Sequence, residues 1–377
     1  MIIPFNKPLL SDKESYSVAR IMKSGRIGGN GIFGKKVERE IEKLLKVKFS
    51  LLTTSCTHAL EMSMMALKIK AGDEVILPSF SFVSAANAVV RVNAKPVFVD
   101  IEDNHFNIDP VKIKNSISRR TKAVICVHYA GFPCQMDRIK QITKQHRLFL
   151  VEDATQAFGS KYGDRFLGTI GDVGCFSFHE TKNITCGEGG VFLTNDTKIA
   201  QAAEIIREKG TNRTEFLRGH IDKYIWLNIG SSFVLSDILA AMLFGQLQRL
   251  RYIIRKRRLV GHRYIEGLRK LEKEGKIILP KFYAKEDHNW HIFYFRVHNE
   301  KTRDSVLRKL KANGIEATFH FIPLHLSPYA RRNYGYRKGD FPVTEKISST
   351  LIRLPIYPSL RTSEQDYITD VLYKIFK

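Results

Sequence analysis

One segment of this sequence constrains the fold more than any other, the run GCFSFHETKNITCGEGG at residues 174–190. Its apolar start, Cys175 to Phe178, predicts a buried strand, and Val191 to Thr194 predicts a second one. The connection between them is too short and too rich in glycine for a helix, so we expect its lysine, Lys182, to face a cleft. Burial disfavours an ammonium ion and would leave Lys182 as a nucleophilic amine. Taken alone, a lysine is more often a solvated surface residue.

Upstream of this segment, short apolar runs alternate with helical patterns. The predicted strands are Glu74–Pro78, Pro96–Asp100, Ala123–Tyr129 and Leu148–Ala154. Such alternation predicts an α/β fold with a mostly parallel sheet that helices cover on both faces. Ligands of these sheets bind at the carboxyl ends of the strands, so we expect Lys182, Asp153 and the turn at Ser55–Thr57 to meet there.

The turn Thr53–Thr57 is rich in hydroxyl groups and opens onto a helical pattern. The free N–H groups of a helix N-terminus, together with side-chain hydroxyls, suit a phosphate. An ordinary Ser/Thr helix cap gives the same pattern, so the turn by itself leaves both interpretations open.

Two further residues near this edge have a structural and a functional interpretation. Asp153 ends an otherwise apolar strand, where a carboxylate is costly unless it has a partner. It is either a surface acid or helix cap, or a carboxylate held against a cationic ring nitrogen. Phe82, which follows the strand Glu74–Pro78, is either a core residue or an aromatic ring that stacks on a ligand.

A cleft lysine, a strand-end aspartate and a hydroxyl-lined helix N-terminus together match the needs of pyridoxal 5′-phosphate (PLP). The lysine forms a Schiff base, the aspartate keeps the pyridine nitrogen protonated, and the helix N-terminus takes the phosphate. The 12 histidines and five cysteines show neither HExxH nor paired-cysteine spacing, so we expect no metal site.

Composition narrows the class of protein further. The net charge of +23 fits nucleic acid, a membrane surface or an anionic substrate, but no nucleic-acid-binding motif accompanies the densest basic run, Arg249–Arg258. No apolar run approaches the length of a membrane span, and the first residues lack the pattern of a signal peptide. The cysteine pattern is typical of a reduced compartment. We therefore expect a cytoplasmic protein with an anionic substrate and neither a nucleic-acid nor a membrane partner.

The length of 377 residues predicts two domains. Residues 1–245 are expected to form a large PLP-binding α/β domain, and residues 246–377 a small α+β domain. A long helical pattern that starts at Ser236 is expected to connect them.

These residues carry a resemblance to the DegT/DnrJ/StrS family of PLP-dependent nucleotide-sugar aminotransferases, and it extends over essentially the whole chain. It rests on the combination of GRIGGNG (25–31), TSCTHALEM (54–62), GDEVILPSFSFVSAANAV (72–89), VEDATQAFGS (151–160), IGDVGCFSFHETKN (170–183), GEGG (187–190), IIREKGTNR (205–213) and FHFIPLH (319–325). The resemblance implies fold-type I, the aspartate aminotransferase fold. Several blocks are most similar to dTDP-4-amino-4,6-dideoxygalactose transaminases.

The resemblance also implies roles for single residues. Lys182 matches the Schiff-base lysine, Asp153 the partner of the pyridine nitrogen and Gln156 the glutamine near the 3-hydroxyl of the cofactor. Phosphate contacts are implied for Ser177, Cys56 and Thr57, and the stacking aromatic ring for Phe82.

Two positions depart from the common pattern of the family. Many members have an asparagine that reaches the cofactor phosphate of the neighbouring subunit, where this chain has Gly230-Ser231-Ser232. This contact is therefore weaker here or made by a hydroxyl. A glycine common in the phosphate turn is Cys56 here, as in the subgroup named above.

The resemblance implies a homodimer that transfers the amino group of L-glutamate to C4 of dTDP-4-keto-6-deoxyglucose, for surface polysaccharide biosynthesis. Arg213 and Arg218 are candidates for neutralising the diphosphate. An enzyme that aminates C3 is the nearest alternative. A PLP sugar dehydratase is a weaker one, because such relatives have histidine in place of the lysine.

Overall fold

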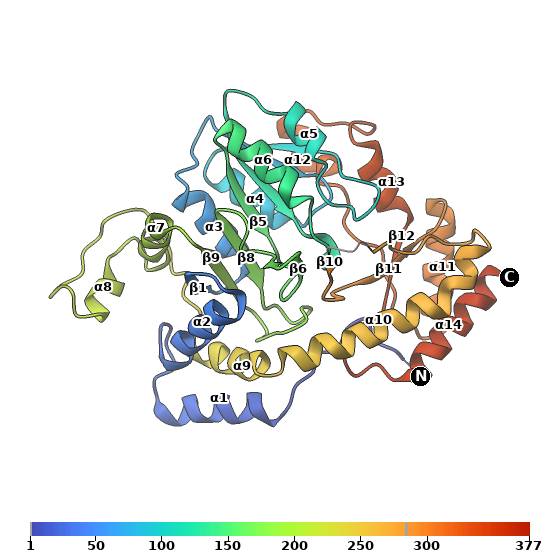
Figure 1. Cartoon of the computed structure of the whole chain (residues 1–377), viewed down its shortest axis with the longest axis horizontal. Coiled ribbons are helices and arrows are strands. Elements are labelled where there is room, and N and C mark those ends of the chain that lie inside the picture. Colours follow the sequence, from blue (N-terminus) through green and yellow to red (C-terminus); the bar gives the residue numbers. More distant parts are fainter. Residues whose placement is uncertain (1, 283–285) are drawn as a thin grey trace.

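The computed structural model describes residues 2–282 and 286–377 of the chain (Figure 1). Within this part, the largest sheet has seven strands in the order β1 (Phe49–Thr53), β9 (Gly190–Thr194), β8 (Val173–Ser177), β5 (Phe149–Asp153), β4 (Thr121–Val127), β2 (Glu74–Pro78) and β3 (Lys95–Val99). All pairs from β8 to β3 are parallel, and β9 runs antiparallel to both of its neighbours. The prediction of a mostly parallel α/β sheet is therefore confirmed.

Helices cover both faces of this sheet because alternate residues of each buried strand point to opposite sides. In β4, for example, Val124 and Cys126 join one core cluster, and Ala123 and Ile125 join the other. The first cluster includes residues of α1 (Asp12–Ser24), α2 (Ile32–Leu45), α5 (Pro110–Asn115), α6 (Met136–His146) and α9 (Asp237–Leu247). The second includes residues of α3 (Cys56–Ala66), α4 (Val83–Arg91), α7 (Thr197–Arg207) and α12 (Pro328–Tyr334).

A third core cluster lies in the C-terminal part of the chain. There, α11 (Glu300–Ala312) and α14 (Thr362–Phe376) accompany the antiparallel pair β11 (Phe293–Arg296) and β12 (Leu351–Leu354). The N-terminal segment also belongs here, because Ile3 is buried in this cluster and its N–H donates to the carbonyl of Gly314 at 2.8 Å. The helix α13 (Pro342–Thr350) packs instead through Ile347 in a smaller cluster with Phe80 and Tyr129.

The long helical pattern that begins at Ser236 forms two helices, α9 and α10 (Leu250–Lys273), with a break at Gln248–Arg249. The first turn of α10 packs in the core of the large sheet through Leu250 and Ile253. From Val260 onward, α10 packs in the C-terminal cluster. The predicted boundary at residue 245 falls within α9, and a division of the chain there remains a proposal.

Shorter elements complete the architecture. They are α8 (Arg213–Leu217), the 3-10 turns η1 (Tyr129–Gly131) and η2 (Leu324–Leu326), and a small sheet of β10 (Glu286–Asp287), β6 (Lys161–Tyr162) and β7 (Arg165–Phe166). Among the described residues, none of the helices combines the length and apolar character that a membrane crossing requires.

Candidate active site

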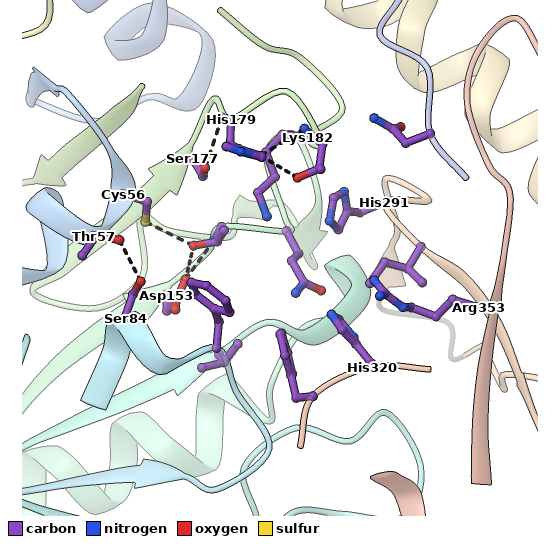
Figure 2. A pocket seen from close by; sticks show the side chains of 18 of the residues that line it. Cys56, Thr57, Ser84, Asp153, Ser177, His179, Lys182, His291, His320 and Arg353 are labelled. Carbon is purple, nitrogen blue, oxygen red and sulfur yellow. Dashed lines mark hydrogen bonds between the residues drawn. The ribbon is translucent and has the colours of Figure 1, made fainter. Parts of the chain in front are cut away.

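A cavity of about 700 Å³ opens at the carboxyl edge of the large sheet, and residues of the C-terminal part form its opposite wall (Figure 2). The wall contains all seven residues that the sequence assigned to a cofactor site: Cys56, Thr57, Phe82, Asp153, Gln156, Ser177 and Lys182. They come together because β1, β2, β5 and β8 point the same way, so the segments that follow these strands share one edge.

Lys182 lies in a bend between β8 and β9, where its N–H donates to the carbonyl of His179 at 2.9 Å. No helix forms in this connection, as the sequence predicts. The lysine side chain is half-buried and reaches into the cavity. Burial lowers the pKa of Lys182, and Arg353 lowers it further. A larger fraction of Lys182 is therefore the neutral amine near pH 7 than of an exposed lysine.

Asp153 is the last residue of β5, and its side chain is buried. Burial raises the pKa of Asp153, while hydrogen bonds from Thr155 and the charge of Lys182 lower it. Thr155 donates its backbone N–H to Oδ1 of Asp153 at 3.2 Å and its hydroxyl to the same oxygen. A cationic N–H group in the cavity would stabilise this desolvated carboxylate further, as the ring-nitrogen interpretation requires.

The hydroxyl-rich turn forms the N-terminus of α3. Ser55 caps this helix, because its side chain accepts from the N–H of His58 at 3.2 Å. The ordinary-cap interpretation is thus correct for Ser55, whereas Cys56 and Thr57 begin the helix and line the cavity. The Thr57 hydroxyl lies 2.7 Å from that of Ser84 in the first turn of α4, so two helix N-termini meet here.

Gly190, at the start of β9, allows the close approach that this turn needs. A Cβ atom at this position would lie 2.4 Å from the carbonyl carbon of Ser55 and 2.5 Å from the N atom of Cys56. A side chain would therefore force the backbone of this turn to shift. Ser177 ends β8 beside it, and its hydroxyl accepts from the N–H of His179 at 3.2 Å.

Gln156 follows Asp153 on the cavity wall. Its Oε1 atom accepts from the N–H of Ala130 at 2.6 Å, and Ala130 has the left-handed φ of 56°. This contact leaves the NH₂ group of Gln156 unused by the described residues, so both of its N–H groups can donate to a ligand.

Phe82 is 60% exposed, and the core interpretation of this residue is therefore wrong. Its ring lies at the cavity wall, with its centroid 6.3 Å from that of Phe321. An exposed aromatic ring beside a polar cavity is available for stacking on a planar ligand.

The two arginines proposed for diphosphate binding do not line this cavity. Arg213 pairs with Glu208 at 3.2 Å, and Arg218 pairs with Glu204 and Glu215 at 2.6 and 2.7 Å. Both lie in α8 or directly after it, in an arm that projects from the sheet in Figure 1.

Several residues of the cavity wall were assigned no role from the sequence. They are Phe5 and Asn6 near the N-terminus and His291, His320 and Arg353 from the C-terminal part. Burial lowers the pKa values of His291 and His320 well below the ordinary histidine value, and the charges of Lys182 and Arg353 lower them further. Both imidazoles are therefore neutral near pH 7. His320 Nδ1 lies 2.6 Å from the hydroxyl of Tyr129.

A mostly parallel sheet with a desolvated lysine, a buried carboxylate and a helix N-terminus at its carboxyl edge defines the fold-type I class of PLP enzymes. Comparison with known proteins identifies the family within this class. Residues 8–373 match the DegT/DnrJ/EryC1/StrS aminotransferase family, and the chain belongs to this family.

Two curated relatives and two solved structures illustrate the similarity. Protein MJ1066 of Methanocaldococcus jannaschii is 36% identical, covering 99% of this chain and 97% of its own length. The spore coat polysaccharide biosynthesis protein SpsC of Bacillus subtilis is 32% identical, covering 100% and 97%. S. venezuelae DesV, solved with a ketimine intermediate, has a TM-score of 0.92 at 29% identity, covering 100% and 99%. Spr1654 of Streptococcus pneumoniae, solved in PMP form, has a TM-score of 0.92 at 26% identity, covering 100% and 98%.

The chain is accordingly an aminotransferase, and its cofactor is PLP. The residues present fit this group. Lys182 supplies an amine with a lowered pKa, Asp153 a buried carboxylate that lacks a cationic hydrogen-bond partner among the described residues, and the N-terminus of α3 an anion site that Gly190 keeps open.

Proposed function

We propose that this protein transfers an amino group from L-glutamate to C4 of a dTDP-4-keto-6-deoxyhexose, most specifically dTDP-4-keto-6-deoxy-D-glucose, in the synthesis of a surface polysaccharide. The observation that carries the proposal is the meeting of Lys182 and Asp153 in one cavity of a family member. A sugar substrate is supported by two relatives, because SpsC is named for polysaccharide biosynthesis and the name of Spr1654 includes sugar aminotransferase.

In this proposal Lys182 binds the cofactor aldehyde covalently, and Asp153 holds the protonated ring nitrogen. Bound there, PLP acts as an electron sink for the carbon that loses or gains the amino group. The NH₂ group of Gln156 lies toward the 3-hydroxyl, and the ring of Phe82 stacks on one face. The N-terminus of α3 at Cys56 and Thr57, with the hydroxyl of Ser177, holds the phosphate.

Once the amino donor displaces it, Lys182 is free to act as a general base and acid. Its lowered pKa keeps Nζ able to accept a proton from the α-carbon of the donor. The same Nζ then delivers this proton to the aldehyde carbon of the cofactor, to which the transferred nitrogen is attached. In the second half-reaction these transfers run in reverse on the keto-sugar.

The choice of C4, of dTDP and of L-glutamate rests on the resemblance of the sequence blocks to dTDP-4-amino-4,6-dideoxygalactose transaminases. Amination at C3 by the same residues is the nearest alternative, because the cavity residues named here serve either position. Lys182 favours transamination over dehydration, since the related dehydratases have a histidine at this position.

We also propose a cytoplasmic homodimer. The arm at residues 213–230 exposes large apolar side chains, among them Trp226 at 78% and Ile229 at 71%. Exposed apolar groups in this number mark a protein interface. The exposed hydroxyls of Ser231 and Ser232 would then reach the cofactor phosphate of the partner. All five cysteines are free and buried, which suits a reduced compartment.

The proposal is tested by incubating the purified PLP-loaded enzyme with L-glutamate and dTDP-4-keto-6-deoxyglucose and determining the amino position of the product by NMR. An amino group at C4 with formation of 2-oxoglutarate is expected. An amino group at C3, or ammonia release without 2-oxoglutarate, would contradict it. A Lys182→Ala variant should lose both turnover and the yellow absorbance of the lysine-bound cofactor, and a variant that keeps both would overturn the assignment of Lys182.

A further inference from the structure

The outward face of α10 carries an excess of positive charge. This helix holds nine basic and two acidic residues, against 61 Lys and Arg and 38 Asp and Glu in the whole chain. Its inner face packs in the core through Ile253, Val260 and Leu268, and Arg257 is buried as well. Most of the other cations of α10 therefore face outward.

Four of these cations form one line along the helix. Arg251 and Arg269 are 18 residues apart, which is about five turns at about 3.6 residues per turn, so they point the same way. Arg255 and Lys273 each lie four residues further on, which places them on the same face. The line is about 33 Å long at about 1.5 Å per residue. All four side chains are exposed, and we call Arg251, Arg255, Arg269 and Lys273 the basic stripe.

The basic stripe is not neutralised by acids of this chain. Within residues 2–282 and 286–377, no acidic side chain forms an ion pair with it, and this includes Glu266 and Glu272 of α10 itself. The alternation of acids and bases that is typical of a solvated helix face is therefore absent from the stripe. Three acids near α10 are instead paired with other cations, in the pairs Arg258–Asp287, Arg263–Asp366 and Lys270–Glu274.

Neither the cavity nor the proposed dimer accounts for this charge. None of the four residues of the basic stripe lines the cavity, whose wall has its own cations in Lys182, Arg257 and Arg353. Figure 1 shows α8 of the arm at the left of the molecule, whereas α10 extends from α9 towards the right. A charged row of this length on an open face therefore calls for an extended anionic partner.

We propose that the basic stripe binds the surface of an anionic lipid bilayer, so that the enzyme associates peripherally with a membrane. Each Lys or Arg near such a surface contributes about 1 kcal/mol. Two exposed apolar side chains, Tyr252 and Leu259, lie seven residues apart on one flank of the stripe. Apolar groups beside a basic helix face suit the boundary between headgroups and acyl chains. Such binding needs no membrane-spanning helix, and it departs from our expectation that the protein has no membrane partner.

A bilayer fits this face better than a nucleic-acid duplex. A helix that reads the major groove, which is about 12 Å wide, must stand clear of its own protein because its diameter with side chains is about 10–12 Å. The helix α10 is embedded instead. Val260 and Leu268 pack inward, and Gln365 of α14 donates to the carbonyl of Val260 at 2.9 Å. A straight row of charges on an embedded helix can meet a flat surface but cannot enter a groove.

The test measures how the full-length, PLP-loaded enzyme partitions onto large unilamellar vesicles, with sedimentation separating bound from free protein. One set of vesicles contains phosphatidylcholine and phosphatidylglycerol, and the other contains phosphatidylcholine alone. Salt is varied between about 0.05 and 0.5 M NaCl, because added ions screen the attraction. The wild type should bind the anionic vesicles at low salt, release them at high salt and leave the neutral vesicles unbound.

Two double variants divide the stripe into halves. One combines Arg251→Gln with Arg255→Gln, and the other combines Arg269→Gln with Lys273→Gln. Each removes two cations and should lower the partition coefficient about 25-fold, since about 1 kcal/mol for each cation is about 5-fold in affinity. Both should keep the yellow absorbance of bound PLP and the unfolding temperature of the wild type, which separates lost binding from lost folding.

A third double variant, Lys140→Gln with Lys144→Gln, is the matched control. These two lysines are exposed and four residues apart on α6, which covers the large sheet. The control removes the same charge from another face, beyond the Debye length of about 10 Å over which charges act at moderate salt. Its partition coefficient should stay within about 2-fold of the wild-type value, because the screened charges of α6 contribute little.

Four results would overturn the inference. They are a wild type that does not bind anionic vesicles at low salt, equal binding to neutral vesicles, an equal loss in the control and the stripe variants, and a double variant of the stripe that binds like the wild type. A DNA duplex is added as competitor in a further experiment. If the wild type binds the duplex more tightly than the vesicles, and the stripe variants lose that binding, the stripe is a nucleic-acid face and the bilayer assignment is wrong.

Discussion

Thr155 donates twice to the same oxygen of Asp153, once from its backbone N–H at 3.2 Å and once from its hydroxyl. The hydroxyl of Thr155 also lies 3.1 Å from Sγ of Cys56, and burial raises the pKa of Cys56 well above the usual thiol value. Oδ1 of Asp153 is therefore occupied by fixed donors, which leaves Oδ2 for a ring nitrogen. Hydrogen bonds through the Thr155 hydroxyl thus connect Cys56, in the phosphate turn, to the carboxylate of Asp153.

Thr155→Val should lower the activity of the enzyme through its effect on Asp153. Burial raises the pKa of Asp153 and Thr155 lowers it, so removing the hydroxyl raises it further. As the pH falls, the carboxylate then becomes protonated at a higher pH than in the wild type, so the acidic limb of the kcat profile should shift to higher pH. The loss of a hydrogen bond to a charged group should also reduce kcat about 10-fold. Thr155→Ser, which retains the hydroxyl, should restore the wild-type profile. An unshifted acidic limb in Thr155→Val would contradict this role.

The large sheet could be predicted in some detail from the sequence because its buried strands are continuous apolar runs. β2 has the bounds expected from its pattern, Glu74–Pro78. The break between α9 and α10 was missed, since the apolar pattern continues through Gln248–Arg249 without glycine or proline.

The cofactor side of the cavity could also be predicted, because its residues directly follow the strands of one parallel sheet. The opposite wall could not. Arg353 reaches the cavity through the pairing of β12 with β11 and through its bonds to Phe319. Both relationships are tertiary, and a lone arginine in a basic chain carries no local signal of them.

Gly190→Ala should reduce affinity for PLP more than it reduces stability. The new methyl group would overlap the backbone at Ser55 and Cys56, so the N-terminus of α3 must shift. Such overpacking costs about 1–3 kcal/mol. The dissociation constant for PLP, measured by fluorescence titration of the apo-enzyme, should rise about 10-fold or more if 1.4 kcal/mol of this cost falls on the phosphate site.

Gly267→Ala is the matched control for this substitution. Gly267 lies in α10, where a Cβ atom would meet only the side chain of Thr369 at 3.4 Å. PLP affinity should be unchanged there. Equal affinity in Gly190→Ala and the wild type would show that the close approach does not serve the phosphate.

Glu152→Gln should destabilise the fold, because Glu152 lies in a fully buried ion pair. Its carboxylate is 2.8 Å from Nε2 of His128 and accepts from the N–H groups of Gly168, Ile170 and Gly171. Breaking one partner of a buried pair costs about 3–5 kcal/mol. Asp137→Asn in the exposed pair with Arg165 should cost less than about 1 kcal/mol. Urea unfolding measures both, and equal costs would contradict the prediction.

Trp226→Asp should dissociate the proposed homodimer. The indole is 78% exposed and donates from Nε1 to the carbonyl of Asn228 at 2.6 Å, so the ring is fixed on the arm while its faces stay open. Large aromatic residues of this kind dominate the binding energy of protein interfaces. Removing one reduces the free energy of association by about 2 kcal/mol or more, which is roughly a 30-fold rise in the dissociation constant of the dimer. Light scattering after size-exclusion chromatography at falling concentration measures this change.

Leu259→Asp, at a 60% exposed position on α10, is the control and should leave the molar mass unchanged. A wild-type protein that is monomeric at all concentrations, or a Trp226→Asp variant that dimerises as tightly as the wild type, would rule out an interface built on this arm.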